Sequence, residues 1–86
     1  MKDIQTLRKR VDEIDDQILK ALSERVAVCR EIGEFKKQQG LPVRDRSREK
    51  QVYTQVKEKA EKFQLQPDQI EALYREIVNM CSAVQK

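Results

Sequence analysis

Residues 2–39 read KDIQTLRKRVDEIDDQILKALSERVAVCREIGEFKKQQ, and they decide the fold because they hold no proline and only one glycine, Gly33. Apolar residues recur through this stretch at the three- and four-residue spacing of an amphipathic helix; they are Ile4, Leu7, Val11, Ile14, Ile18, Ala21, Val28, Ile32 and Phe35. The position that should follow Ile18 by seven is occupied by Arg25. We therefore predict a helix from about residue 3 to residue 39 that carries an arginine on its apolar stripe.

The length of this helix has a consequence for the whole chain. A helix of about 38 residues is roughly 57 Å long at 1.5 Å per residue. A compact domain of this size has a radius of gyration of roughly 12 Å, and so a diameter of about 30 Å. The helix is expected to extend beyond its own domain and to expose an apolar stripe, which another chain should cover.

The remaining sequence predicts two shorter helices. Gly40-Leu41-Pro42 ends the long helix, because glycine suits the cap and proline cannot continue the helix. Asp45 or Ser47 can cap the second helix, whose stripe is Val52, Val56, Ala60 and Phe63. Pro67 suits the first position of the third helix, which carries Ile70, Leu73, Ile77, Cys81 and Val84. With no strand pattern, the expected fold is all-α, in a single domain spanning 1–86.

Composition favours a helical protein that relies on a partner, since apolar and charged residues each make up 38% of the chain. Met1 is followed by a charged amphipathic segment, so we expect no signal peptide. No stretch has the apolar length that a membrane-spanning helix needs. We therefore expect a cytoplasmic protein with no membrane partner.

Residue types limit the chemistry. Histidine is absent, and neither Cys29 with Cys81 nor any acidic cluster has the spacing of metal ligands. We expect two buried free thiols, no metal and no cofactor, and any catalysis should need little proton transfer. The 18 basic and 15 acidic residues are interleaved, which argues against a nucleic-acid partner. The net charge of +3 still favours a small anionic ligand.

Four polar residues occupy positions where the helical pattern calls for apolar ones, and each has an ordinary explanation. Arg25 can set the register of a helix pair, and Lys36 can be a solvated residue near a helix end. Glu49 can interact with the dipole of the second helix. Gln85 can belong to a frayed end.

Taken together, the same four residues describe a binding site. Lys36 follows Arg25 by eleven residues, which places it about 20° away around the helix and roughly 16 Å along it. Two separated cations, one carboxylate acceptor and one amide in a single cleft suit a compact dianion that carries a hydroxyl group.

The sequence resembles the all-helical (AroQ-type) chorismate mutases over nearly its whole length. The matching segments are Leu7-Arg8 with Ile14-Asp15, Ser23-Glu24-Arg25, Ile32-Gly33-Glu34-Phe35-Lys36 and Pro42-Val43-Arg44-Asp45-Arg46-Ser47-Arg48-Glu49. The last segment is the most specific. The resemblance implies a Claisen rearrangement of chorismate to prephenate, on the route to phenylalanine and tyrosine. It also implies an intertwined homodimer in which each site takes one arginine from the partner chain.

The resemblance also implies a role for each site residue. Arg25 and the partner subunit's Arg8 are similar to the family's carboxylate-binding arginines, and Arg48 to a further cationic contact. Lys36 and Gln85 resemble the two donors to the ether oxygen of the breaking bond.

For the rest of the site, Glu49 resembles the acceptor for the ring hydroxyl, helped by the backbone near Asp45. Cys81 falls where some relatives carry a hydroxyl or amide group near a carboxylate, so weaker polar support is expected there.

Helix geometry fits this arrangement independently. Arg8 and Arg25 lie 17 residues apart, which is about 25 Å along one helix, too far to serve one small substrate in the same chain. Two long helices packed antiparallel and crossing near residues 16 and 17 would bring Arg8 of one chain to Arg25 of the other. A two-fold dimer with two equivalent sites follows.

Two alternatives stay open. A lyase on the same scaffold would split isochorismate into salicylate and pyruvate with much the same anion-binding groups. A non-catalytic helical dimerisation module would use Arg25 only to set the register. The mutase is favoured over the lyase because the segments of the long helix and of the linker quoted above match the mutases closely. A pericyclic rearrangement also needs no nucleophile, base, metal or cofactor, which suits a chain without histidine.

Overall fold

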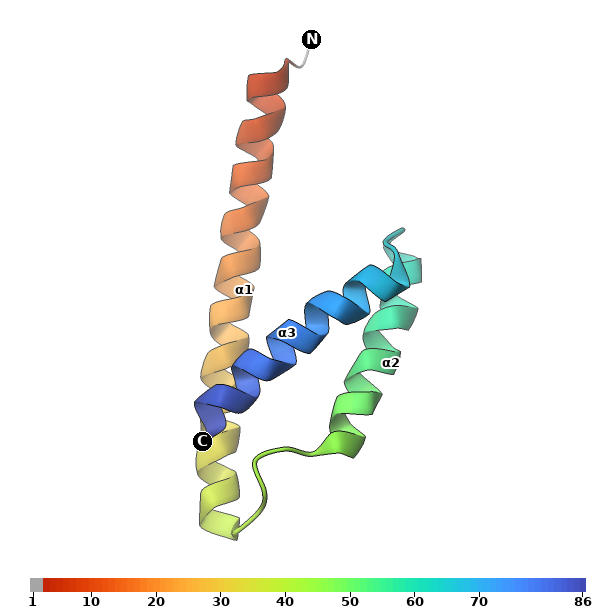
Figure 1. The fold of residues 1–86 in the computed structure, drawn as a ribbon. Coiled ribbons are helices and arrows are strands. Elements are labelled where there is room, and N and C mark those ends of the chain that lie inside the picture. The colour runs from red at the N-terminus through yellow and green to blue at the C-terminus, as the bar shows by residue number, and fades with distance from the viewer. Residues whose placement is uncertain (1–2) are drawn as a thin grey trace.

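A computed structural model describes residues 3–86 as three helices joined by two short connections (Figure 1). Helix α1 comprises Ile4–Gln39, helix α2 Arg46–Lys62 and helix α3 Pro67–Gln85. The prediction of an all-α chain with one long and two shorter helices is confirmed.

Local sequence accounts for the helix ends. The Asp3 side chain caps α1 by accepting the Thr6 N–H at 2.8 Å. Gly40 ends α1 with φ of 69°, a left-handed conformation that glycine adopts without the steric penalty of a Cβ atom. Asp45 caps α2 by accepting the Arg48 N–H at 3.0 Å. Pro67 is the first residue of α3, where its missing N–H costs nothing.

Helix α3 holds the chain together by packing against both α1 and α2 (Figure 1). Within residues 3–86, α1 and α2 do not pack against each other. The core that results is small, and its buried apolar residues are Cys29, Ala60, Val78 and Cys81. Phe63 and Leu73, which the periodicity placed on inward stripes, are 72% and 54% exposed. The apolar stripe predicted for α3 also omitted Val78, which is buried because α3 packs against two other helices.

Helix α1 extends well past the other two helices, as its length predicts. The molecule measures 58 × 23 × 15 Å with a radius of gyration of 16.2 Å. Figure 1 shows the N-terminal half of α1, coloured red to orange, projecting away from α2 and α3. The apolar residues along this projection are between 38% and 58% exposed: Ile4, Leu7, Val11, Ile14 and Ile18. A single copy of the chain therefore leaves an extended apolar stripe in water.

Over the part of the chain that the structure describes, no helix combines the length and the apolar character needed to cross a bilayer.

Candidate active site

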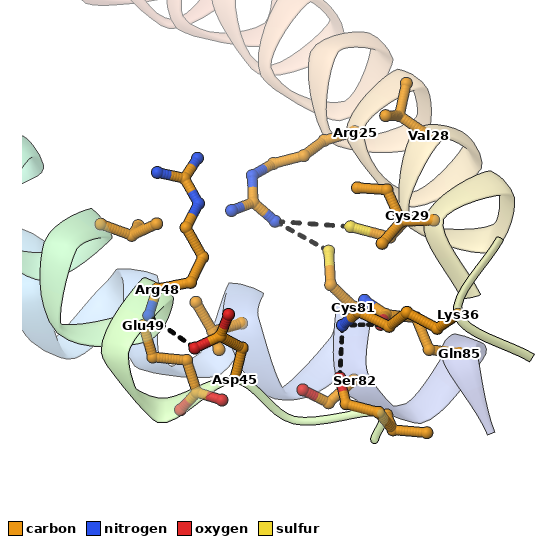
Figure 2. Close-up of a pocket in the computed structure, with 14 residues that line it drawn as sticks. Arg25, Val28, Cys29, Lys36, Asp45, Arg48, Glu49, Cys81, Ser82 and Gln85 are labelled. Atoms are coloured by element: carbon orange, nitrogen blue, oxygen red, sulfur yellow. Dashed lines mark hydrogen bonds between the residues drawn. The ribbon is translucent and has the colours of Figure 1, made fainter. Parts of the chain in front are cut away.

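A cavity of about 340 Å³ lies where α1, α3 and the first turn of α2 meet. This volume is in the range of sites for small molecules. Of the eight site residues that the sequence predicts, seven line this cavity: Arg25, Lys36, Asp45, Arg48, Glu49, Cys81 and Gln85. Figure 2 shows that they come from three separate segments of the chain, so the fold assembles the site from distant parts of the sequence.

Arg25 reaches from α1 toward the end of α3. Its Nη1 donates to the Cys81 Sγ at 2.8 Å and lies 4.0 Å from the Cys29 Sγ (Figure 2). Burial, followed by hydrogen bonding with Cys81, raises the pKa of the Cys29 thiol to about 11. The Cys29 thiol is therefore neutral at ordinary pH and does not neutralise the guanidinium. Arg25 retains its positive charge for an anionic ligand.

Both cysteines are buried and free, as the sequence predicts.

Lys36 and Gln85 form a second pair on the cavity wall. The Lys36 Nζ donates to the Gln85 Oε1 at 2.8 Å and to the Val43 carbonyl oxygen at 2.5 Å. An ammonium group has no acceptor, so it must face the oxygen of the amide, which leaves the amide NH2 as a donor. Gln85 is only 8% exposed, so its side chain is held and is not part of a frayed end.

Gly33 allows α3 to approach α1 closely enough for this pair to form. A Cβ atom at this position would lie 2.8 Å from the Gln85 Cα and 3.1 Å from the Gln85 Cβ. Real Cβ atoms essentially never make a contact of 2.8 Å, and here the neighbour is backbone, which cannot rotate away. A side chain at residue 33 would therefore push the last turn of α3 outward.

We expect Gly33→Ala to lower kcat by at least tenfold while the protein stays folded. The substitution displaces the amide of Gln85, which the resemblance assigns to the ether oxygen, and misplacing a catalytic group by about 1 Å can cost a hundredfold in rate. Alanine favours the interior of α1 by roughly 1 kcal/mol, which offsets the lost packing of a single terminal turn. The measurements are kcat and the thermal midpoint, and unchanged kcat would show that the close approach is irrelevant to the site.

The first turn of α2 supplies the anionic and cationic groups on the opposite wall. Asp45, Arg48 and Glu49 all line the cavity, and the cap that Asp45 makes to the Arg48 N–H fixes this turn. Arg44 donates two hydrogen bonds to the Glu49 carboxylate, at 2.8 and 2.9 Å. These bonds, more than any other contact, hold the pKa of Glu49 below its ordinary value of 4.5. Glu49 is therefore an ionised acceptor at neutral pH.

The cavity as a whole suits an organic anion. Three cationic side chains line it, those of Arg25, Lys36 and Arg48, against the carboxylates of Asp45 and Glu49. Apolar side chains complete the lining: Val28, Ile32, Val43, Val52 and Val78. Such a site can bind carboxylates through arginine forks, enclose a carbon ring and accept one hydrogen bond from a hydroxyl group at Glu49. Among residues 3–86, no group of three or more His, Cys, Asp or Glu residues is placed to hold a metal ion.

Arg8 is the one predicted site residue that does not line the cavity. It is exposed on the projecting part of α1, 17 residues before Arg25 on the same helix. This placement agrees with the geometric argument that Arg8 cannot serve the site of its own chain. Its place in a partner's site stays a prediction.

Several residues at or beside the cavity were given no role in the sequence analysis. Ser82 and Cys29 line it, the Val43 carbonyl accepts from Lys36, and Arg44 holds Glu49. Cys29 was noted only as a buried thiol, yet its spacing of four from Arg25 already placed it on the same face. The Arg44–Glu49 contact depends on the shape of the linker, which side-chain periodicity does not reveal.

Comparison with known proteins identifies the family. The model of the family described as "Chorismate mutase type II" matches residues 7–86. A chorismate mutase from Methanocaldococcus jannaschii is 41% identical over 51 residues, which cover 59% of this chain and 52% of that protein. A bifunctional chorismate mutase/prephenate dehydratase from Aquifex aeolicus is 29% identical over 89 residues, covering 100% of this chain and 25% of that protein. The chain thus spans about half the length of the first relative and a quarter of the second.

A solved structure of another protein has the same fold. A conserved hypothetical protein from Pyrococcus furiosus superposes with a TM-score of 0.77 at 31% identity, covering 96% of this chain and 95% of that one. The three-helix architecture is therefore shared over nearly the full length of both chains. With a family match that runs from the second turn of α1 to the end of α3, the chain belongs to the chorismate mutase type II family.

Proposed function

We propose that this chain catalyses the rearrangement of chorismate to prephenate. In this reaction the ether C–O bond of the enolpyruvyl arm breaks as a C–C bond to the ring forms, with no group gained or lost. The observation that carries the proposal is the Lys36–Gln85 pair, which presents N–H donors on the wall of a cavity also lined by Arg25 and Arg48. Negative charge grows on the ether oxygen in the transition state, and preorganised donors stabilise such charge.

The site's cations and carboxylate have separate tasks in this proposal. Arg25 and Arg48 bind the two carboxylates, and in doing so hold the flexible arm over the ring in its reactive conformer. Lys36 and the NH2 group of Gln85 donate to the ether oxygen. Glu49 accepts from the ring hydroxyl. No step requires a general base, which agrees with a cavity that contains no histidine.

The active form in this proposal is a two-fold homodimer whose sites each take Arg8 from the partner chain. The exposed stripe of Ile4, Leu7, Val11, Ile14 and Ile18 supports it, because so much apolar surface on one helix calls for a covering surface. A second α1 packed antiparallel would cover that stripe. It would also bring the partner subunit's Arg8 to the Arg25 end of the cavity.

The pH profile of kcat/KM is expected to be flat from about pH 5 to pH 9. The donor amide of Gln85 does not titrate in this range. The Arg44 hydrogen bonds lower the pKa of Glu49, so this carboxylate stays ionised across the whole window and becomes protonated only as the pH falls through that lowered value. The check is kcat/KM measured in constant ionic strength buffers. An optimum on the acid side, with activity falling steeply toward pH 7, would contradict this assignment of donors and acceptors.

The proposed function is tested by chorismate consumption combined with a measurement of mass in solution. The expected result is conversion of chorismate to prephenate by a species of twice the chain mass. Isochorismate is assayed in parallel, because a lyase on this scaffold would release pyruvate and salicylate from it. Activity on isochorismate alone would assign the lyase, and activity on neither substrate would leave only the dimerisation module.

A further inference from the structure

Arg44 lies in the linker between α1 and α2 and does not line the cavity, yet it makes the closest contacts to Glu49. Its Nε donates to the Glu49 Oε2 at 2.9 Å and its Nη2 donates to the Glu49 Oε1 at 2.8 Å. Two parallel bonds from one guanidinium fix the plane of a carboxylate as well as its position. The Glu49 side chain is only 12% exposed, so the carboxylate itself is largely shielded from water, whereas the Arg44 side chain is 35% exposed.

We infer that Arg44 is a positioning residue that orients Glu49 for the substrate hydroxyl, an inference that rests on the function proposed above. An ionised carboxylate offers about four lone pairs to donors. Arg44 occupies one on each oxygen, and the Arg46 Nη1 occupies a third, on Oε1 at 3.3 Å. The remaining lone pair can accept one more hydrogen bond, which the inference assigns to the ring hydroxyl.

The charged groups around Glu49 show why Arg44 matters more than its neighbours. Arg46 approaches from the first turn of α2, but its side chain is 74% exposed and it makes one longer contact. Arg75 approaches from α3, where its main partner is Glu71, and Glu49 adds only a smaller increase to its pKa. The hydrogen bonds from Arg44 are the largest cause of the lowered pKa of Glu49. Arg44 is thus expected to set both the ionisation and the orientation of this acceptor.

The two linker arginines provide a matched pair of variants. Arg44→Gln and Arg46→Gln each remove one positive charge next to the same carboxylate, but only Arg44→Gln removes the paired hydrogen bonds. Arg44→Lys is the third variant, because lysine keeps the charge and cannot form the planar fork. The readouts are kcat and KM, the acid limb of kcat/KM, and the carboxyl carbon titration of Glu49 by NMR in protein labelled with ¹³C-glutamate. A Glu49→Gln sample assigns the signal.

Arg44→Gln is expected to lower kcat/KM by about tenfold, a typical loss for a charge-assisted hydrogen-bond pair. It should also raise the pKa of Glu49 toward 4.5, and the acid limb should move to higher pH with it. Arg46→Gln should change kcat/KM by less than about twofold, as exposed ion pairs do. Arg44→Lys keeps the charge but loses the paired bonds, so it should raise the pKa of Glu49 by less than Arg44→Gln does and still lose activity, which separates orientation from charge.

The inference is overturned if Arg44→Gln matches Arg46→Gln in both activity and titration. It is also overturned if Arg44→Gln loses activity while the Glu49 titration stays unchanged. Circular dichroism and solution mass establish that each variant is folded. If Arg44→Gln fails to fold, Arg44→Lys becomes the test. A wild-type kcat/KM in Arg44→Lys would contradict the orienting role. The NMR titration needs no turnover, so a wild-type chain inactive toward chorismate would refute the proposed function without being mistaken for failure of the Arg44–Glu49 pairing.

Discussion

Replacing Lys36 by alanine is expected to lower kcat by about a hundredfold to a thousandfold while leaving the fold and the proposed dimer intact. Removing one preorganised donor from a developing oxyanion typically has an effect of that size. The loss here has two parts. The Lys36 Nζ is itself a donor on the cavity wall, and it also accounts for the orientation of the Gln85 amide by donating to Oε1 at 2.8 Å. Without the ammonium group, the amide can turn its oxygen toward the reacting ether.

The neighbouring lysine provides the control for this variant. Lys37 follows Lys36 on the same helix turn, but its side chain is 60% exposed and lies 3.9 Å from Glu34. Lys37→Ala removes the same charge from the same end of α1, so wild-type kcat is expected. Measurement of kcat, circular dichroism and solution mass for both variants completes the test. Near wild-type turnover by Lys36→Ala would show that Lys36 takes no part in catalysis.

Replacing Arg25 by leucine is expected to reduce kcat/KM by more than a hundredfold without lowering the thermal midpoint. Arg25 is half-buried, with its Nη1 at the buried Cys81 thiol, and the proposed function assigns it to a substrate carboxylate. Buried charged residues contribute little to stability, and apolar replacements of similar size are often neutral or stabilising. The loss should therefore appear in catalysis and not in folding.

The same variant separates an enzyme from a dimerisation module. A dicarboxylate that binds the folded wild-type chain must raise its melting temperature by mass action. Arg25→Leu should lose most of this ligand-dependent increase, whereas Arg10→Gln, at an exposed arginine that pairs with Glu13, should keep it. If no dicarboxylate raises the melting temperature of the wild-type chain, and Arg25→Leu is more stable than wild type, Arg25 serves only to set the register of a helix pair.

The parts of the fold that depend on residues adjacent in the sequence could be predicted from the sequence. Local backbone chemistry predicts that Gly40 ends α1, that Asp45 or Ser47 caps α2 and that Pro67 is the first residue of α3. The structure confirms Gly40 and Pro67 and shows that the cap is Asp45. The projection of α1 also follows, because a helix of 36 residues cannot be covered by helices of 17 and 19.

The partnerships within the site were harder to predict because they join distant residues. Polar residues on apolar faces pointed to Arg25, Lys36, Glu49 and Gln85, and the structure places all four on the cavity wall. Helical periodicity does not show that Lys36 meets Gln85 across 49 residues of sequence. That contact depends on how α3 crosses α1 at Gly33, and the contact of Arg44 with Glu49 depends on the linker conformation. Both are properties of tertiary packing.

In the proposed dimer each site takes arginines from two chains, and mixing two inactive variants tests this sharing. Arg8→Ala and Arg25→Ala are each expected to be inactive as homodimers. When equal amounts are unfolded together and refolded, about half of the dimers contain one chain of each kind, and each mixed dimer then has one intact site and one doubly defective site. We predict recovery of about a quarter of wild-type activity per chain. No recovery above the sum of the separate variants, with mixed dimers verified by mass, would contradict a site shared between two chains.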